Sequence, residues 1–98
     1  MTVNFLPVAA AELQDAVDWY NRQHPGLGER FRTEVGRTIE RILIFPEGWT
    51  RVSRRSRRCL TRKFPYGLIY QVRPNSILIV AVAELHRKAG YWKDRTGE

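Results

Sequence analysis

The spacing of apolar residues changes near Trp49, and this change restricts the chain to folds that begin with helices and end with strands. Before Trp49, apolar residues recur every three to four positions, the spacing of one face of an α-helix. After it, β-branched and aromatic residues form short runs typical of strands. Segregated helices and strands indicate an α+β fold, and 98 residues allow one core, so we expect a single domain over residues 1–98.

Two helices are predicted in the first half of the chain, over residues 9–24 and 28–45. Pro25 and Gly26 separate them, and Pro46 ends the second. A connection this short makes the helices antiparallel neighbours, an αα-hairpin. The apolar stripes are formed by Leu13, Ala16, Val17 and Tyr20 in the first helix and by Phe31, Val35, Ile39 and Ile42 in the second.

Four strands are predicted, one before the helices and three after them. Pro7 closes the first, and Pro74-Asn75 is a hairpin turn signal between the last two. The final strand is apolar on both faces, which indicates a central strand covered on each side. The expected fold is an N-terminal strand followed by an antiparallel αα-hairpin packed on one face of a small antiparallel sheet, with one short helical turn in the tail. The predicted strands span residues 2–6, 60–64, 66–72 and 76–84.

The charge of the chain is concentrated in one segment. Of the 17 Lys and Arg residues, seven lie in residues 51–63, which contain no Asp or Glu. The remaining ten are balanced by ten acidic residues, so the rest of the chain is formally neutral. A localised excess favours a polyanionic partner, nucleic acid or an acidic protein. A solvated edge strand, whose charges prevent association between sheets, is the alternative interpretation.

Other classes of protein are excluded by what the sequence lacks. The single cysteine, Cys59, leaves no internal disulfide and no multi-cysteine zinc site, which fits a reducing cytosol. There is no N-terminal signal segment, and no apolar run approaches the roughly 20 residues that span a bilayer. We therefore expect a soluble cytoplasmic protein with no cofactor, no metal site and no membrane association.

Several motifs, in order along the chain, resemble the RelE/ParE superfamily of toxins from type II toxin–antitoxin systems. FPYGLIYQV followed by AVAELHRKAGYWKDR is similar to the end of these toxins. AAAELQDAVDWYNRQHPGLGERF resembles their first helix and turn, and IERILIFPEGW the end of their second helix. Basic residues before the FPY triplet also recur in the superfamily. The resemblance extends from about residue 9 to residue 95.

This resemblance implies a small toxin that arrests growth, contributes to plasmid stabilisation and forms a hetero-oligomer with a cognate antitoxin. Two mechanisms occur on the implied fold. RelE-like members cleave messenger RNA on the ribosome, with a cluster of Lys and Arg, a C-terminal Tyr and no metal. ParE-like members lack most of that cluster and inhibit DNA gyrase. Whether this chain is an enzyme depends on which branch it follows.

Metal-free RNA cleavage needs cations for the phosphate charge, a group that activates the 2′-hydroxyl and an acid for the leaving oxygen. Arg58 and Arg62 are the candidate cations, and Tyr91 is a candidate acid or a surface on which a base stacks. His86 is a possible proton carrier, because its ordinary pKa is close to neutral. Arg87 completes the set that a ribonuclease mechanism would use.

Departures from the RelE-like pattern favour the ParE-like branch. Gly67 stands where RelE-like enzymes have an Arg after the strand tyrosine, and Leu60 stands where a Lys is expected. Many ParE-like members have a His at the position of Glu84 and a Pro at that of Ala89. Glu84 is interpreted as a cap on the strand edge or as a partner that orients a neighbouring cation.

The preferred prediction is a ParE-like gyrase inhibitor. The alternatives are a ribosome-dependent ribonuclease and a toxin-fold remnant that only binds its antitoxin or nucleic acid. An acidic antitoxin segment that folds on binding would also account for the basic run. The residues predicted to bind the target or the antitoxin are Arg51, Arg54, Arg55, Arg57, Arg58, Arg62, Lys63, Arg87, Tyr91 and Trp92.

Overall fold

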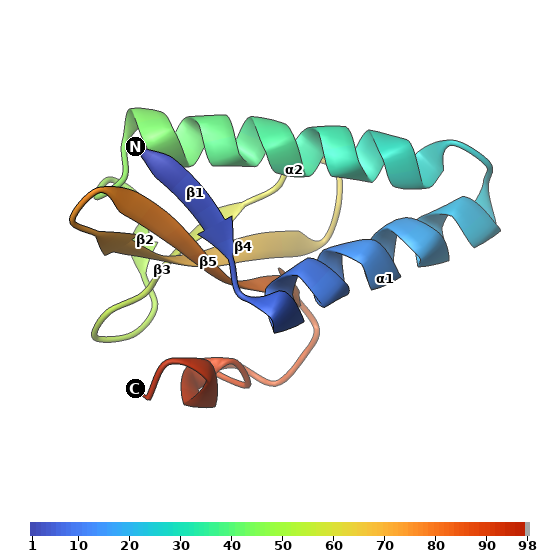
Figure 1. The fold of residues 1–98 in the computed structure, drawn as a ribbon. Coiled ribbons are helices and arrows are strands. Elements are labelled where there is room, and N and C mark those ends of the chain that lie inside the picture. Colours follow the sequence, from blue (N-terminus) through green and yellow to red (C-terminus); the bar gives the residue numbers. More distant parts are fainter. Residues whose placement is uncertain (98) are drawn as a thin grey trace.

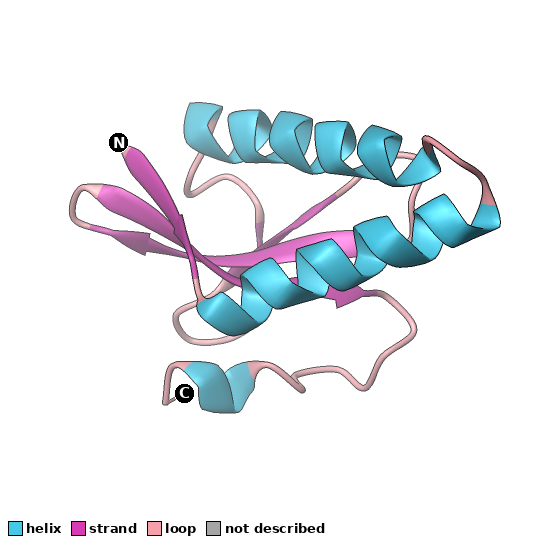
Figure 2. Cartoon of the chain, turned by 45° about the vertical axis from the view of Figure 1, so that its right-hand side comes forward, coloured by secondary structure: helices cyan, strands magenta, loops and turns pink. Residues whose placement is uncertain are grey.

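Two helices cover one face of a five-stranded sheet, and the C-terminal segment lies against the other face (Figures 1 and 2). The computed structural model describes residues 1–97. Neither helix in this part of the chain is long and apolar enough to cross a membrane. In chain order the elements are β1 (Thr2–Phe5), α1 (Pro7–Gln23), α2 (Leu27–Ile44), β2 (Thr50–Arg51), β3 (Arg57–Leu60), β4 (Tyr66–Arg73), β5 (Ser76–Glu84) and a 3₁₀ turn, η1 (Lys93–Arg95).

Both predicted helices are present, and their apolar stripes form the main core. Helix α1 begins two residues earlier than expected, because Pro7 is its first residue. Proline suits this position, where the missing N–H has no partner within the helix in any case. Ala16, Val17 and Tyr20 are buried as predicted, whereas Leu13 is only partly buried. The stripe of α2 packs on the same side of the sheet.

The helices approach most closely where Gly28 of α2 meets α1. The Gly28 amide donates to the Asn21 side-chain oxygen at 2.8 Å. A Cβ atom at Gly28 would overlap the Val17 carbonyl oxygen and lie 2.6 Å from Asn21 Cγ. Gly26, in the connection, has a φ of +89°, a conformation that glycine adopts without strain. These two glycines therefore allow the sharp, close-packed hairpin.

The sheet is mixed, and the prediction of an antiparallel sheet was wrong for one strand. The strand order is β1-β5-β4-β3-β2, and β1 pairs parallel with β5, whereas the other pairs are antiparallel. After β1 the chain forms both helices and then strands β2, β3 and β4, and only the last strand, β5, pairs with β1. No local sequence pattern distinguishes a parallel from an antiparallel edge for a four-residue strand.

The strand predicted over residues 60–64 was also wrong. The strand is β3, which lies within the basic run, and residues 61–65 form a turn. The Thr61 hydroxyl donates to the carbonyl oxygens of Phe64 and Tyr66, both at 3.0 Å. Lys63 has a φ of +67°, which a strand does not allow. The Thr61 amide still donates to the Tyr66 carbonyl oxygen of β4 at 3.0 Å, so pairing between the strands ends at Thr61 and residues 62–65 connect them.

Strand β5 is buried on both faces, as its sequence predicts, although β4 occupies the centre of the sheet. Ile79 pairs with Tyr70 and Ala81 with Ile69, so Val80 is an extra residue in the ladder, a β-bulge. The bulge brings Val80 and Ala81 to the same face, where both pack against the C-terminal segment.

Two glycine substitutions in α2 are expected to have opposite effects on stability. Gly28→Ala should destabilise the protein by about 1–3 kcal/mol, because the new methyl group meets α1. Gly36→Ala should stabilise it by roughly 0.5–1 kcal/mol, since nothing lies within 4 Å of the added Cβ and alanine favours a helix. Urea unfolding of both variants measures the difference. Equal effects would contradict the close approach at Gly28.

Candidate functional site

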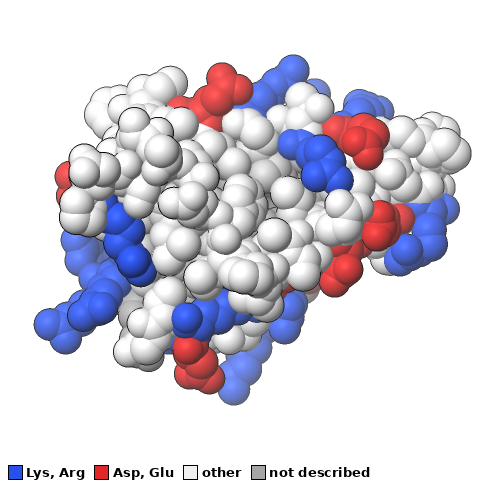
Figure 3. Space-filling view, viewed as in Figure 1, with Lys and Arg blue, Asp and Glu red and all other residues white. Residues whose placement is uncertain are grey.

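The basic run does not form one surface, because it follows a hairpin, a strand and a turn that face different directions. Successive residues of β3 point to opposite faces of the sheet, so Arg57 and Arg58 diverge. Figure 3 shows Lys and Arg side chains gathered at the end of the molecule where β2 and β3 lie in Figure 1. The seven cations of the run fall into three groups, which we name the hairpin surface, the tail cavity and the loop cavity.

The hairpin surface consists of Arg51, Arg54, Arg55 and Arg57 around a shallow hollow of about 160 Å³. Arg51 donates to the Arg54 carbonyl oxygen at 3.1 Å, and Arg57 donates to the Trp49 carbonyl oxygen at 2.9 Å. These two guanidinium groups therefore cap backbone carbonyls near their own hairpin. Part of the basic run stabilises local structure.

The tail cavity, of about 320 Å³, lies between the sheet and residues 84–93. Its walls bring together four residues that the sequence predicted as functional, namely Arg58, Arg87, Tyr91 and Trp92. Arg58 Nε is buried, and no hydrogen-bond partner for it lies within residues 1–97. A Cβ at Gly67 would lie 3.1 Å from Arg58 Cγ, so the space left by this glycine holds the arginine stem.

Glu12, which the sequence analysis did not select, joins three separate parts of the fold beside the tail cavity. Oε1 of Glu12 accepts a hydrogen bond from the Val82 amide at 3.0 Å. The Arg95 guanidinium donates to both carboxylate oxygens, at 2.7 and 2.9 Å. Arg95 also donates to the Val80 carbonyl oxygen at 3.0 Å. This carboxylate–guanidinium pair satisfies backbone groups on the edge of β5 that β1 leaves unpaired.

Tyr91 and Trp92 fasten the C-terminal segment to the body of the protein. The Tyr91 hydroxyl donates to Glu12 Oε2 at 2.7 Å, and the Arg87 guanidinium carbon lies 3.7 Å from the centre of the tyrosine ring. Burial and the Glu12 hydrogen bond raise the pKa of Tyr91 well above its ordinary value. Trp92 is 5% exposed and packs beside Val80 and Ala83. Contact between Trp92 and a partner would require this segment to move.

His86 and Glu84 pair with each other at the end of β5. The His86 ring is exposed, and its Nδ1 lies 2.5 Å from Glu84 Oε1, which also accepts the His86 amide at 3.0 Å. The amide hydrogen bond, followed by the ring contact, holds the pKa of Glu84 below its ordinary value. Glu84 thus makes both contacts that the sequence suggested: it accepts the His86 amide at the end of the strand, and it contacts the His86 ring.

The loop cavity, of about 590 Å³, contains Arg62 and Lys63 and lies against α2. Two arginines of α2, Arg30 and Arg37, contribute to its walls, and sequence reasoning missed both because they lie outside the basic run. They are seven positions apart, which is about two helical turns, so they share one face of α2. This spacing is the sequence signal that could have identified the two arginines as one basic face of the helix.

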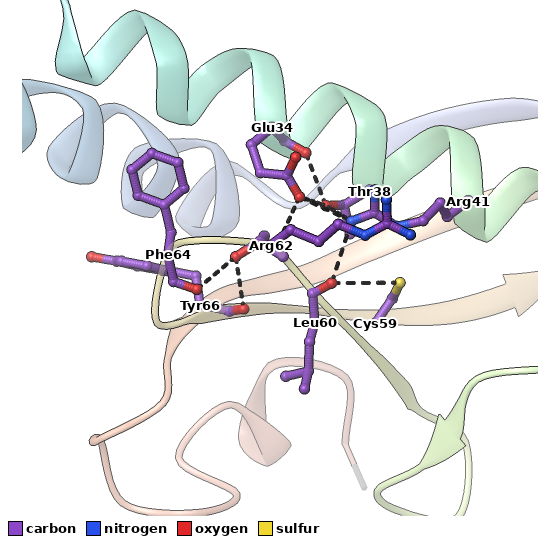
Figure 4. Close-up of polar contacts among 9 residues, drawn as sticks. Glu34, Thr38, Arg41, Cys59, Leu60, Arg62, Phe64 and Tyr66 are labelled. Carbon is purple, nitrogen blue, oxygen red and sulfur yellow. Dashed lines mark hydrogen bonds and ion pairs between the residues drawn. The ribbon is translucent and has the colours of Figure 1, made fainter.

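Glu34 fixes the loop against α2 (Figure 4). Its Oε2 accepts the Arg62 amide at 2.6 Å and Arg41 Nη2 at 2.9 Å, and the Thr38 hydroxyl lies 3.3 Å away. Burial alone would raise the pKa of Glu34, but the hydrogen bonds from Arg62, Arg41 and Thr38 outweigh it and lower the pKa. The carboxylate is therefore charged and internally compensated.

The proposed ribonuclease residues are only partly brought together. Arg58, Arg87 and Tyr91 line the tail cavity, whereas Arg62 lines the loop cavity. Cys59 is buried between the sheet and the helices, and burial raises the pKa of its thiol despite the nearby Arg41 and Arg62. Within residues 1–97, no three His, Cys, Asp or Glu side chains are grouped so that they could hold a metal ion.

Comparison with known proteins identifies relatives of both the sequence and the fold. A family model described as the ParE toxin of the type II toxin–antitoxin system parDE matches residues 3–89. A solved structure described as the chromosomal ParDE TA system from P. aeruginosa superposes with a TM-score of 0.76 and 18% identity, over 88% of this chain and 97% of that chain. Identity this low indicates a shared fold. No curated protein matches the sequence.

Replacing Glu12 is expected to loosen the C-terminal segment. Glu12→Gln should lower the free energy of unfolding by about 2 kcal/mol, because it removes the charge that binds Arg95 and the Tyr91 hydroxyl. Hydrogen exchange at Val82 and solvent quenching of tryptophan fluorescence measure the release. Asp15→Asn, an exposed change one turn further along α1, is the control. Unchanged exchange at Val82 in Glu12→Gln would contradict this role.

The Glu34 network is expected to depend on pH. Because the folded-state pKa lies below the ordinary value of 4.5, the charged carboxylate stabilises the fold above pH 4.5 and loses this effect as the pH falls. Glu34→Gln should therefore cost about 1–3 kcal/mol at neutral pH and less at about pH 3. Thermal unfolding across this range, with exposed Glu40→Gln as the control, measures it. A constant difference between wild type and Glu34→Gln would be inconsistent with the network.

Proposed function

The chain belongs to the family of ParE toxins of type II toxin–antitoxin systems, and from this we propose that it arrests growth by binding and inhibiting DNA gyrase. It acts in the cytoplasm and is held inactive in a hetero-oligomer with a cognate antitoxin. A plasmid that carries both genes would be stabilised by this pair. In this proposal the toxin needs no catalytic residue.

The separation of the cations is the observation that carries the proposal. Metal-free RNA cleavage requires cations and proton-transfer groups to converge on one phosphate. Here Arg62 lies in a different cavity from Arg58, and the Tyr91 hydroxyl already donates to Glu12. Three dispersed basic surfaces favour a protein that binds over one that cleaves.

A ribosome-dependent ribonuclease is the second candidate, and one observation favours it. Arg58, Arg87 and Tyr91 share the tail cavity, and the buried Arg58 Nε has no partner within the described chain. A phosphate oxygen would satisfy that donor. His86, at the end of β5, would then supply the proton transfer.

Labelling experiments distinguish these functions. The chain is induced alone in a bacterial host, and labelled thymidine and methionine are supplied during the first minutes. Gyrase inhibition predicts that DNA synthesis falls first and that the purified chain blocks supercoiling by gyrase. An earlier fall in translation would establish the ribonuclease alternative. Undisturbed growth would support the third alternative, a toxin-fold remnant that binds only its antitoxin or nucleic acid.

Substitutions are expected to reduce growth arrest gradually if the toxin acts by binding. Tyr91→Phe and Arg62→Ala should each change the concentration needed for arrest by less than about tenfold, because a binding surface distributes its energy over many contacts. Loss of a catalytic acid would reduce cleavage by about 10²–10⁴-fold. Growth curves at graded induction measure the effect, with Arg22→Ala as a control at an exposed arginine outside the three basic surfaces.

A further inference from the structure

The loop cavity contains four cations that the protein does not use internally. Arg30 and Arg37 lie on α2, and Arg62 and Lys63 lie on the turn before β4. All four residues are exposed, and their side chains form no hydrogen bond or ion pair within residues 1–97. Two elements distant in the sequence thus place unpaired positive charge around one hollow, an arrangement suited to an anionic ligand.

The acidic residue in the wall does not neutralise these cations. Glu34 is 8% exposed, and its carboxylate is occupied by Arg41, Thr38 and the Arg62 amide. Arg41 already balances its charge. The four outer cations therefore remain available to a negatively charged ligand.

The floor of the loop cavity is apolar and firmly packed. Leu27, Phe64 and Pro65 line it together with Tyr20. The Phe64 ring meets the rings of Tyr20 and Phe31 edge to face, with ring centres 5.1 Å apart in each case. Such a floor accepts an aliphatic or aromatic side chain. Because Phe64 and Tyr20 already contact neighbouring rings, they are poorly placed to stack with a nucleic-acid base.

The turn that carries Arg62 and Lys63 is held in place before any ligand binds. The Thr61 hydroxyl bonds to the carbonyl oxygens of Phe64 and Tyr66, and Glu34 accepts the Arg62 amide. A preorganised site loses little conformational entropy on binding. This distinguishes the loop cavity from a collection of mobile surface charges.

We propose that the loop cavity is a docking site for an acidic segment of a partner protein, with carboxylates on Arg30, Arg37, Arg62 and Lys63 and one apolar side chain on the Phe64 floor. The volume of about 590 Å³ is in the range of specific ligand sites. In the hairpin surface, by contrast, Arg51 and Arg57 already bind backbone carbonyls. The loop cavity therefore binds the acidic segment more tightly than the hairpin surface does.

A titration followed by amide NMR tests this proposal. The full chain, made with ¹⁵N label by cell-free synthesis, is titrated with a capped peptide of repeating Glu-Glu-Leu. The same titration with repeating Gln-Gln-Leu removes the charge and keeps the apolar side chain. Signals of residues 27–37 and 62–64 should shift at about one tenth of the peptide concentration that affects residues 51–57. First shifts at residues 51–57, or no shifts at all, would overturn the proposal.

Two double variants with the same change of net charge show whether position matters. Arg37→Glu with Lys63→Glu should weaken peptide binding by about tenfold or more. Arg22→Glu with Arg73→Glu, both exposed and outside the three basic surfaces, should weaken it by less than about twofold, because solvent and salt screen distant charges. Equal weakening would mean a diffuse charge effect and would reject the site.

Other outcomes are equally decisive. If Arg37→Glu with Lys63→Glu does not fold, the milder pair Arg37→Gln with Lys63→Gln replaces it, and an unchanged affinity of that pair would also reject the site. Tighter binding of single-stranded oligothymidine than of the acidic peptide at residues 62–64 would identify a nucleic-acid surface instead. Because these measurements need no toxicity, their failure would leave the proposed gyrase inhibition untouched.

Discussion

The ion pair between Glu12 and Arg95 is the interaction that holds the free edge of β5 and the C-terminal segment together. Strand β1 ends beside Ile79 because Pro7 begins a helix, and the edge of β5 beyond that point has no strand to pair with. Glu12 and Arg95 satisfy backbone groups of Val82 and Val80 on that edge. An unpaired buried amide costs about 1–3 kcal/mol, so this one ion pair both completes the sheet and attaches the tail.

A second carboxylate, the buried Glu34 of α2, has the same kind of role at the connection between β3 and β4. It binds Arg41 of its own helix and the amide of Arg62, and so fixes the turn that forms the loop cavity. The carboxylates of Glu12 and Glu34 are thus paired with donors inside the protein, and they do not neutralise the arginines on the surface. In a chain with a net charge of +7, this division makes positive charge available to partners without destabilising the core.

The positions of the cations matter more for function than their number. One scaffold supports binding or cleavage depending on which groups reach a common point. Arg58 and Arg87 share the tail cavity, whereas Arg62 lies on the helical side of the sheet. The two candidate proton carriers contact carboxylates, Tyr91 with Glu12 and His86 with Glu84. Both groups are therefore already engaged within the protein.

Sequence alone determined the elements whose signals are local: both helices, the hairpin of β4 and β5, and one concentrated block of positive charge. It did not determine the parallel pairing of β1 with β5 or the turn at residues 61–65. It also did not show that the cations of the basic run lie on three separate surfaces. It also did not identify Glu12 and Glu34, whose spacing resembles that of any solvated acid on a helix. Their partners lie 70 and 83 residues away for Glu12 and 28 residues away for Glu34. Only tertiary structure decides such contacts, because side-chain periodicity specifies the face of an element and not what the fold brings to that face.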